Sequence, residues 1–188
     1  MYVRDAKKRE EVWLLDRFEE FGFEDPAFRS RDYVIALDEE AGRRVGFGRI
    51  RVHSGDPEYC EVTTVGVLPD WRRQGVGAHI VERLVEYARD QGFETVYAFA
   101  SLDDYLEQFG FQRVLEGDLA DNQRDRLEAV RETDDPETEA FAVDVDEFGI
   151  PTRLRRRWET NTDEEEEVPE DFGIDPSSAT YKYDTGRR

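Results

Sequence analysis

The sequence predicts a mixed α/β fold: a mostly antiparallel sheet flanked by helices, with an acidic extension at the C-terminus. Three observations lead to this fold class. Strand-like and helix-like spacings of apolar residues alternate along residues 1–117. A turn signal at residues 54–57 separates two apolar runs, which predicts a hairpin. A strand, a helix and a strand then follow, the order of a sheet that carries helices on its faces.

The first third of the chain is expected to contain one helix and four strands. Apolar residues at helical spacing, with Leu14, Leu15, Phe18 and Phe21 on one side, predict a helix at residues 6–21. A loop follows at residues 22–31. The four strands are short apolar runs between turn residues. They are expected at residues 2–4, 33–37, 45–53 and 58–68.

The next helix has the clearest pattern in the chain. At residues 75–90 it carries one apolar stripe, and Gly92 follows as its C-terminal cap. The stripe consists of Ile80, Val81, Leu84, Val85 and Ala88. The remaining elements are expected as strands at residues 95–100, 111–114 and 140–145 and helices at residues 102–109 and 118–132, with strand character returning at 179–184.

Charge divides the chain near Gly117. Residues 1–117 carry a net charge of −8, and the shorter segment 118–188 carries −12. We therefore expect a core domain at residues 1–117, a helix and a strand at 118–158 that complete it, and an acidic tail at 159–188. Residues 159–171 hold eight acids and no base, so the tail is expected to be mobile.

Composition excludes several classes of protein. The 188 residues include 46 acids and 26 bases, a net charge of −20, which argues against a nucleic-acid partner. No apolar run is long enough to cross a membrane, and no signal peptide is recognisable, so we expect a cytoplasmic protein without a membrane partner. Cys60 is the only cysteine, and His53 and His79 lie far apart in sequence, so no metal site is expected.

The types of charged residue indicate an environment of high salt concentration. Only three lysines accompany 23 arginines, and the acids are spread along the whole chain. Dense surface carboxylates keep a protein soluble at high salt, at the cost of self-repulsion at low salt. The balance resembles proteins of halophilic archaea; an ordinary acidic protein from a GC-rich genome is the alternative.

The segment at residues 65–78 is the strongest functional signal. A strand ends near Pro69, a loop with two arginines and two glycines follows, and then a helix begins. Glycines let a ligand approach the backbone, and the free N–H groups at a helix start bind anions. A dinucleotide-binding fingerprint needs glycine where Ile80 stands, and a phosphate-binding Walker loop needs a lysine that is absent here.

With those two motifs excluded, the segment at residues 65–78 resembles that of the GNAT superfamily of acetyl-CoA-dependent N-acyltransferases. Its signature, Gln/Arg-x-x-Gly-x-Gly/Ala, is matched by Arg72-Arg-Gln-Gly75-Val-Gly77. The opening Val3-Arg-Asp-Ala6 and the later Tyr105-Leu-Glu-Gln-Phe-Gly-Phe111 resemble the first and last motifs of that family, in the right order. The resemblance covers about residues 1–115 and implies acetyl-CoA as co-substrate, an amine as acceptor and no metal.

The resemblance also implies which residues bind the coenzyme. The backbone around Val65 and Val67 would pair with the pantetheine arm, and the N–H near Val67 would face the thioester oxygen. The diphosphate would lie on the glycine-containing loop. The implied residues are Val65, Gly66, Val67, Arg72, Arg73, Gln74, Gly75, Val76, Gly77 and Ala78.

Two catalytic candidates follow from the same resemblance. Glu61 lies 14 residues before Gly75, where the histone-acetylating branch carries its glutamate base; a solvent-facing strand carboxylate is the alternative. The family's general-acid tyrosine stands four residues before the glycine of the last motif, and here that position holds Leu106. Tyr105 is one residue earlier, about 100° away on a helix, and is the candidate acid.

Three functions are therefore compared. The first is an N-acetyltransferase that moves an acetyl group from acetyl-CoA to a primary amine by direct attack on the thioester. The second is an acyl-CoA-binding module with little or no catalysis, which Leu106 favours. The third is an interaction protein in which the acidic C-terminal part matters most. The acceptor and the oligomeric state stay open at this point.

The charge density gives a first testable prediction. Repulsion between surface charges is screened within about 3 Å at molar salt but extends to about 30 Å at 0.01 M. The melting temperature should therefore rise steadily from dilute buffer to molar KCl. A thermal-shift series checks this, and equal stability across the series would contradict the halophilic interpretation.

Overall fold

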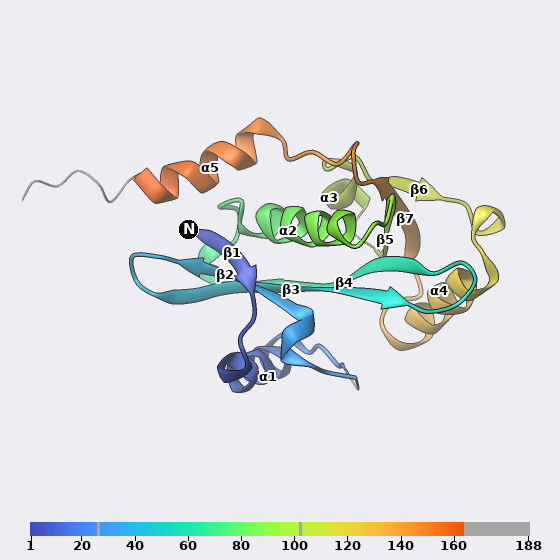
Figure 1. The fold of residues 1–188 in the computed structure, drawn as a ribbon, viewed down its shortest axis with the longest axis horizontal. Coiled ribbons are helices and arrows are strands. Elements are labelled where there is room, and N and C mark those ends of the chain that lie inside the picture. Colours follow the sequence, from blue (N-terminus) through green and yellow to red (C-terminus); the bar gives the residue numbers. More distant parts are fainter. Residues whose placement is uncertain (26, 102, 164–188) are drawn as a thin grey trace, which may run out of the picture.

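A computed structural model describes residues 1–25, 27–101 and 103–163. Its centre is a seven-stranded sheet with the order β1-β2-β3-β4-β5-β7-β6 (Figure 1). Strands β4 and β5 are parallel, and all other neighbours are antiparallel. The strands are β1 (Tyr2–Asp5), β2 (Tyr33–Asp38), β3 (Arg43–His53), β4 (Tyr59–Val67), β5 (Thr95–Ala100), β6 (Gln112–Val114) and β7 (Glu139–Asp144). The predicted fold class is confirmed.

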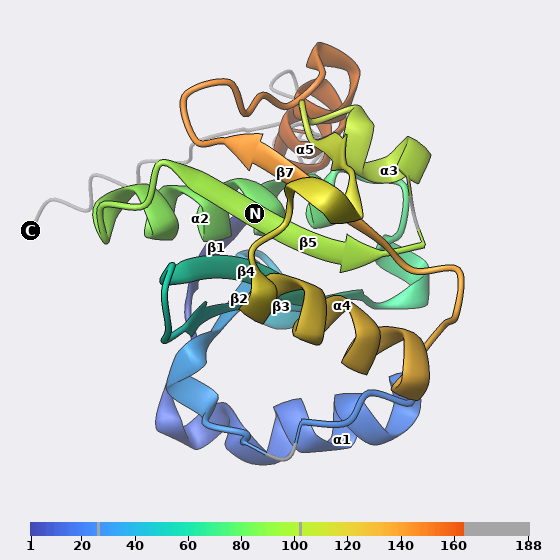
Figure 2. The same cartoon turned by 90° about the vertical axis from the view of Figure 1, so that its right-hand side faces the viewer.

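Helices cover both faces of this sheet. They are α1 (Glu11–Phe21), α2 (Val76–Asp90), α3 (Asp103–Glu107), α4 (Asp121–Thr133) and α5 (Thr152–Asp163). Helices α2, α3 and α5 lie on one face, and α1 and α4 lie on the other (Figure 2). None of these described helices is both long and apolar enough to cross a membrane.

The predicted apolar stripe of α2 forms the larger core. All five of its members are buried, packed against the sheet together with residues of β2, β3 and β5. Gly46 on β3 allows this close approach, because a Cβ there would lie 2.9 Å from Ile80 Cδ1. The helix therefore rests directly on the sheet, and its N-terminal end is held in a fixed place.

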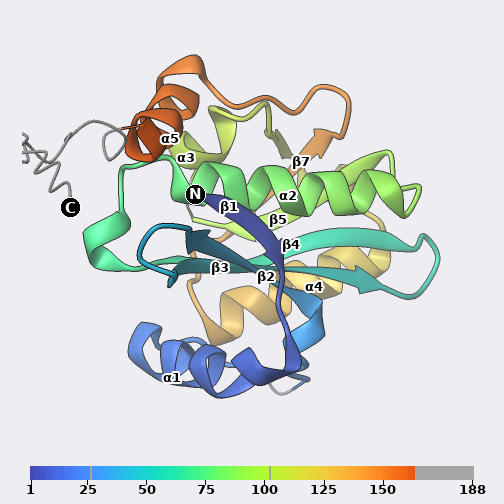
Figure 3. The ribbon, with the colours of Figure 1, turned by 60° about the vertical axis from the view of Figure 1, so that its left-hand side comes forward.

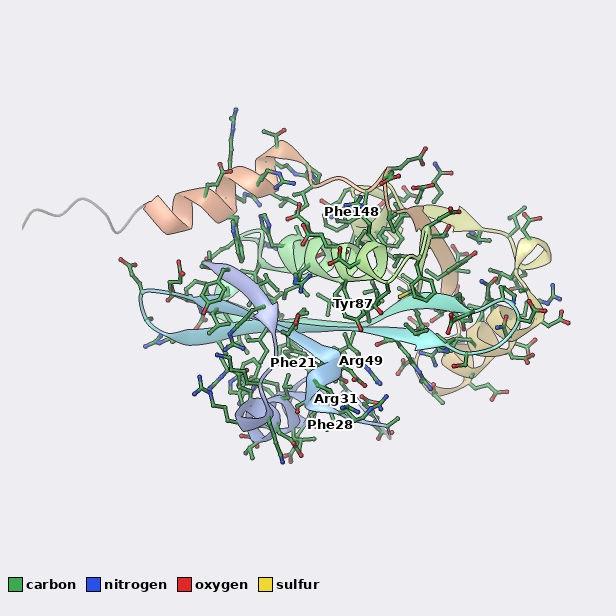
Figure 4. The ribbon with its side chains drawn as sticks, viewed as in Figure 1. Phe21, Phe28, Arg31, Arg49, Tyr87 and Phe148 are labelled. Atoms are coloured by element: carbon green, nitrogen blue, oxygen red, sulfur yellow. The ribbon has the colours of Figure 1, made fainter. Side chains whose placement is uncertain are left out.

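The opposite face is divided between α1 and α4. Leu14 and Phe18 of α1 pack on Tyr33, Ile35 and Phe47. Phe21 and Phe28 lie on this side of the sheet, and Tyr87 lies on the α2 side (Figure 4). The expectation for α1 was wrong in two respects: the α-helix begins at Glu11, after a 3₁₀ turn, and Leu15 is 46% exposed.

The pairing of β4 with β5 is short. Only Cys60 with Val96 and Glu61 with Tyr97 face each other across the two parallel strands. Beyond these pairs β4 continues to Val67 beside β3, while β5 continues to Ala100 beside β7. The two strands therefore separate in the middle of the sheet, and an opening lies between residues 62–67 and 98–100.

Helix α5 was not predicted. Its sequence offers a narrow apolar side, Leu154 and Trp158 four residues apart, among four arginines. Because the helix extends to Asp163, the tail expected at residues 159–188 begins inside it. Residues 164–188, including the expected strand at 179–184, lie outside the described residues. Strand β7 lies between β5 and β6, so residues after Gly117 belong to the same sheet.

Candidate functional site

Two cavities meet at the opening between β4 and β5. The first, the loop cavity, encloses about 450 Å³. It is lined by Phe21, Val65, Val67, Arg72, Arg73, Gly75, Val76, Gly77, Ala78, Tyr105 and Leu154. The second, the α4 cavity, encloses about 320 Å³ between β4, β5 and the C-terminal end of α4. Val65 and Tyr105 line both cavities, so these two residues mark the junction.

The backbone of the loop before α2 forms part of the wall of the loop cavity. Gly75, immediately before the helix, has φ +83°, and Arg73 has φ +66°. Glycine adopts this left-handed conformation at little cost, whereas a side chain such as that of Arg73 makes it less favourable. The turn aims the first residues of α2 into the cavity, where their N–H groups have no partner inside the helix. Such a helix start attracts an anion.

The two loop arginines add positive charge to this helix start. Arg72 donates from Nε to the carbonyl of Val67 at 3.1 Å, and its guanidinium lies 5.8 Å from the ring centre of Phe21. Arg73 also lines the cavity. No carboxylate is among the described residues that line it. The loop cavity is therefore a positive site in a protein with a net charge of −20.

Eight of the ten predicted coenzyme residues line the loop cavity, and two do not. Gly66 is buried against the ring of Phe47, where no Cβ would fit. Gln74 donates from Nε2 to the carbonyl of Asp70 at 2.9 Å, which braces the turn before the helix. Both residues therefore support the structure around the loop and do not line the cavity.

Helix α5 supplies a wall that the sequence did not indicate. A Cβ at Gly75 would lie 2.5 Å from the carbonyl oxygen of Leu154. Arg157 Nη1 donates to the carbonyl of Arg73 at 3.1 Å, and the rings of Trp158 and His79 stack with centres 4.2 Å apart. Figure 3 shows α5 and α3 beside the N-terminal end of α2. The C-terminal part of the chain thus helps to hold the loop.

Tyr105 lies at the junction of the two cavities. Its hydroxyl is next to the first turn of α2, because a Cβ at Gly77 would lie 2.5 Å from the hydroxyl oxygen. Burial raises the pKa of this hydroxyl to about 12, so it stays protonated at neutral pH. Leu106 is buried in the core and lines the α4 cavity. The one-residue offset in the motif therefore still leaves a hydroxyl at the junction.

Glu61 lies elsewhere. Its carboxylate is 1% exposed and accepts three hydrogen bonds of 2.9–3.2 Å from Arg126 on α4 and one of 2.5 Å from His53. Burial by itself raises the pKa of Glu61, but the hydrogen bonds from His53 and Arg126 outweigh it and hold the pKa below its usual value. Glu61 is not among the residues that line either cavity.

The wall of the α4 cavity includes two carboxylates that the sequence analysis did not single out. Asp134 follows the last turn of α4, and Asp135 is the next residue. Their only sequence signal is an acidic pair directly after an amphipathic helix. Among the described residues, no group of three or more His, Cys, Asp or Glu side chains is arranged to hold a metal ion.

Comparison with known sequences identifies relatives of part of this chain. A sequence model of the acetyltransferase (GNAT) family matches residues 2–115. Mycothiol acetyltransferase of Thermobifida fusca is 32% identical over 83 residues, which cover 40% of this chain and 25% of that protein. The enzyme of the same name from Arthrobacter is 30% identical over 80 residues, 41% of this chain and 24% of that protein. The chain thus spans about a quarter of the length of these curated relatives.

Solved structures share the fold. The Mycobacterium tuberculosis protein Rv2747, in complex with CoA and NLQ, superposes with a TM-score of 0.63 at 19% identity, over 77% of this chain and 99% of that one. Neisseria gonorrhoeae N-acetylglutamate synthase, complexed with coenzyme A and N-acetyl-glutamate, gives 0.60 at 16% identity, over 76% of this chain and 34% of that one. These structures confirm the expected GNAT-like architecture.

The buried Glu61 cluster gives a prediction on stability. Glu61→Gln leaves Arg126 without its carboxylate and should lower the free energy of unfolding at pH 7 by about 1–3 kcal/mol. The folded protein holds the pKa of Glu61 below the ordinary 4.5, so this stabilisation is complete above pH 4.5 and is lost as pH falls through the folded pKa. The difference between parent and variant should therefore shrink in acid.

Denaturant unfolding at pH 7 and at pH 4 or below measures this difference. Glu58→Gln is the matched control, because Glu58 is exposed and lies immediately before β4, the strand that carries Glu61. Equal stability of the parent and Glu61→Gln at pH 7 would show that the cluster contributes nothing to the fold.

Proposed function

Because the chain belongs to the acetyltransferase (GNAT) family, we propose that it transfers an acetyl group from acetyl-CoA to a primary amine by direct attack on the thioester. One observation supports this proposal above all. A positive helix start opens into a gap between two strands, and a protonated tyrosine stands where that gap meets a second cavity. Such an arrangement suits an anionic donor on one side and an acceptor on the other.

The loop cavity suits the donor in its positive charge and in the backbone groups that it offers for hydrogen bonds. The diphosphate of acetyl-CoA would accept hydrogen bonds from the first turn of α2, with Arg72 and Arg73 beside it. Beyond Glu61, no described strand pairs with the β5-facing edge of β4. The amides of the pantetheine arm can pair with that edge as an added strand would. The N–H near Val67 would then face the thioester oxygen, where negative charge develops.

The reaction removes two protons from the acceptor nitrogen and supplies one to the leaving sulfur. The ammonium form of the acceptor loses one proton, the neutral nitrogen forms the C–N bond and then loses a second proton to solvent or base, and the C–S bond breaks to release the thiolate of coenzyme A. Tyr105 is proposed to donate a proton to this thiolate, since its hydroxyl lies at the junction and keeps its proton at neutral pH. Solvent then returns a proton to the tyrosine.

Glu61 remains the predicted base, although its position gives this role little support. Its carboxylate is bound to Arg126 and His53 and lines neither cavity. The same Glu61→Gln variant distinguishes the two roles. A base would lose about 10²–10⁴-fold in maximal rate, whereas a structural residue would change stability and leave the rate of the folded enzyme nearly the same.

The acyl-CoA-binding module is the second candidate. Leu106, buried where the family carries a tyrosine, favours it. The hydroxyl of Tyr105 beside Gly77 favours the enzyme instead. The proposed cell setting is the cytoplasm of a salt-accumulating organism, on the charge balance of the chain. The acidic-tail interpretation concerns residues that lie mainly outside the described part of the chain.

The loop cavity predicts how coenzyme binding depends on sequence. Gly77→Leu should block the diphosphate and displace Tyr105, because even a Cβ at this position lies 2.5 Å from the tyrosine hydroxyl. Replacing both Arg72 and Arg73 with alanine should weaken CoA binding about tenfold or more and flatten its salt dependence. Titration calorimetry with CoA measures both effects.

Replacing both Arg9 and Arg43 with alanine is the control for total charge, because both arginines are exposed and neither is among the residues that line the loop cavity. If CoA binds equally well to the loop variants and to this control, the diphosphate does not occupy the loop.

Tyr105 provides the test of the chemistry. Tyr105→Phe should lower kcat about 10²-fold while the KM for acetyl-CoA changes little, because it removes one hydroxyl and preserves the ring. Tyr87→Phe, at an exposed position on α2, should leave both constants unchanged. Thiol release from acetyl-CoA measures the rates. An unchanged kcat in Tyr105→Phe would mean that water protonates the thiolate.

A further inference from the structure

The α4 cavity differs from the loop cavity in the sign of its charge. The charged side chains among its described lining residues are Asp134 and Asp135, and none of those residues is a lysine or an arginine. The loop cavity has the opposite composition, with Arg72 and Arg73 and no carboxylate. A donor with several negative charges would suit the loop cavity, and an acceptor with positive charge would suit the α4 cavity.

The two carboxylates are available to a ligand. In a chain with 23 arginines, neither Asp134 nor Asp135 forms an ion pair within 4 Å with a described arginine, although Asp134 is close enough to Arg126 to contribute to the raised pKa of that guanidinium. Asp135 Oδ1 accepts a hydrogen bond from the N–H of Glu137 at 2.9 Å, and its carboxylate also interacts with Ser101 at the end of β5. These contacts hold the carboxylate of Asp135 beside the C-terminal end of β5, and no described cation forms an ion pair with it.

The rest of the wall is mostly apolar. Its side chains include Phe23, Val62, Val65, Phe99, Leu106 and Val130. Thr63 also lines the cavity, and its hydroxyl is buried without a hydrogen-bond partner in the described structure. An acceptor that fits here has a hydrocarbon body and a cationic group, and it carries no carboxylate, because a carboxylate would be repelled by the two aspartates.

The charge of the reacting nitrogen argues for a second cationic group. A carboxylate beside an ammonium stabilises its charged form and raises its pKa, which opposes the deprotonation that attack requires. The hydrogen bonds from Glu137 and Ser101 lower the pKa of Asp135, which makes this carboxylate a weak base. Asp134 and Asp135 are therefore better suited to hold a group that stays protonated throughout the reaction.

We propose that the acceptor is a diamine with an apolar spacer: one amine lies at the Val65–Tyr105 junction, and the second, as an ammonium, is bound by Asp134 and Asp135. This inference rests on the proposed function and adds the substrate class and two specificity-determining residues. The reacting amine forms the amide and loses a proton to solvent or base, while the second amine keeps its charge.

The test compares acceptors that share one hydrocarbon chain. Thiol release from acetyl-CoA is measured with 1,6-diaminohexane, hexylamine and 6-aminohexanoic acid. The diamine should have a kcat/KM about tenfold above that of the monoamine, and the amino acid should be the poorest acceptor. A monoamine that reacts as well as the diamine, or an amino acid that reacts better, would overturn the proposal.

The variants assign this preference to the two aspartates. Asp134→Asn and Asp135→Asn, alone and together, should lower kcat/KM for the diamine about tenfold more than kcat/KM for hexylamine, which removes the advantage of the diamine. The asparagine at position 135 retains an oxygen for the N–H of Glu137. Glu132→Gln on the same helix removes the same charge from an exposed position outside the cavity and should change nothing. An unchanged preference in the aspartate variants would overturn the proposal.

A binding measurement separates this proposal from the proposed function. Calorimetry with 1,6-diaminohexane is run on the protein saturated with CoA and on the free protein, for parent, Asp134→Asn and Glu132→Gln. Binding that Asp134→Asn weakens and Glu132→Gln preserves supports the diamine site even if no amine is acetylated, in which case only the transferase activity is refuted. Absence of diamine binding in the parent overturns the diamine site, whatever the enzyme acetylates.

Discussion

The separation of β4 from β5 is the constraint on which the rest of the site depends. The strands pair at Cys60 and Glu61 and then follow different neighbours, β3 on one side and β7 on the other. A continuous sheet at this point would place hydrogen-bonded backbone where the two cavities now meet. Because the sheet opens, a ligand held on the α2 face can reach a ligand held on the α4 face through the middle of the fold.

The charges of the molecule are arranged around this opening. At the last β4–β5 pair, the buried carboxylate of Glu61 binds Arg126 and so ties α4 to the sheet. That helix ends at the aspartates of the α4 cavity. On the other face, Arg72 and Arg73 mark the start of α2. The two cavities thus have walls of opposite charge, and the loop cavity is positive although the net charge of the chain is −20.

Helix α5 shows how a segment beyond the family motifs serves the site. The family model ends at residue 115, yet Leu154 and Trp158 pack on Gly75, the residue immediately before α2. Two features require glycine at position 75. Its backbone is left-handed, and the carbonyl of Leu154 leaves no room for a Cβ. The loop is therefore shaped both by its own sequence and by a helix nearly 80 residues away.

The sequence by itself determined the sheet-and-helix architecture, the stripe of α2 and the loop with two arginines and two glycines that precedes this helix. Each of these depends on residues close together in the chain, so apolar spacing or glycine positions reveal them. Only the tertiary structure decided that Glu61 faces Arg126, that the hydroxyl of Tyr105 reaches Gly77, and that Asp134 lines a cavity with β4. Local spacing sets which face of an element a residue occupies. Which residue contacts that face depends on packing between segments that are distant in sequence. The spacing of residues within one segment therefore cannot predict it.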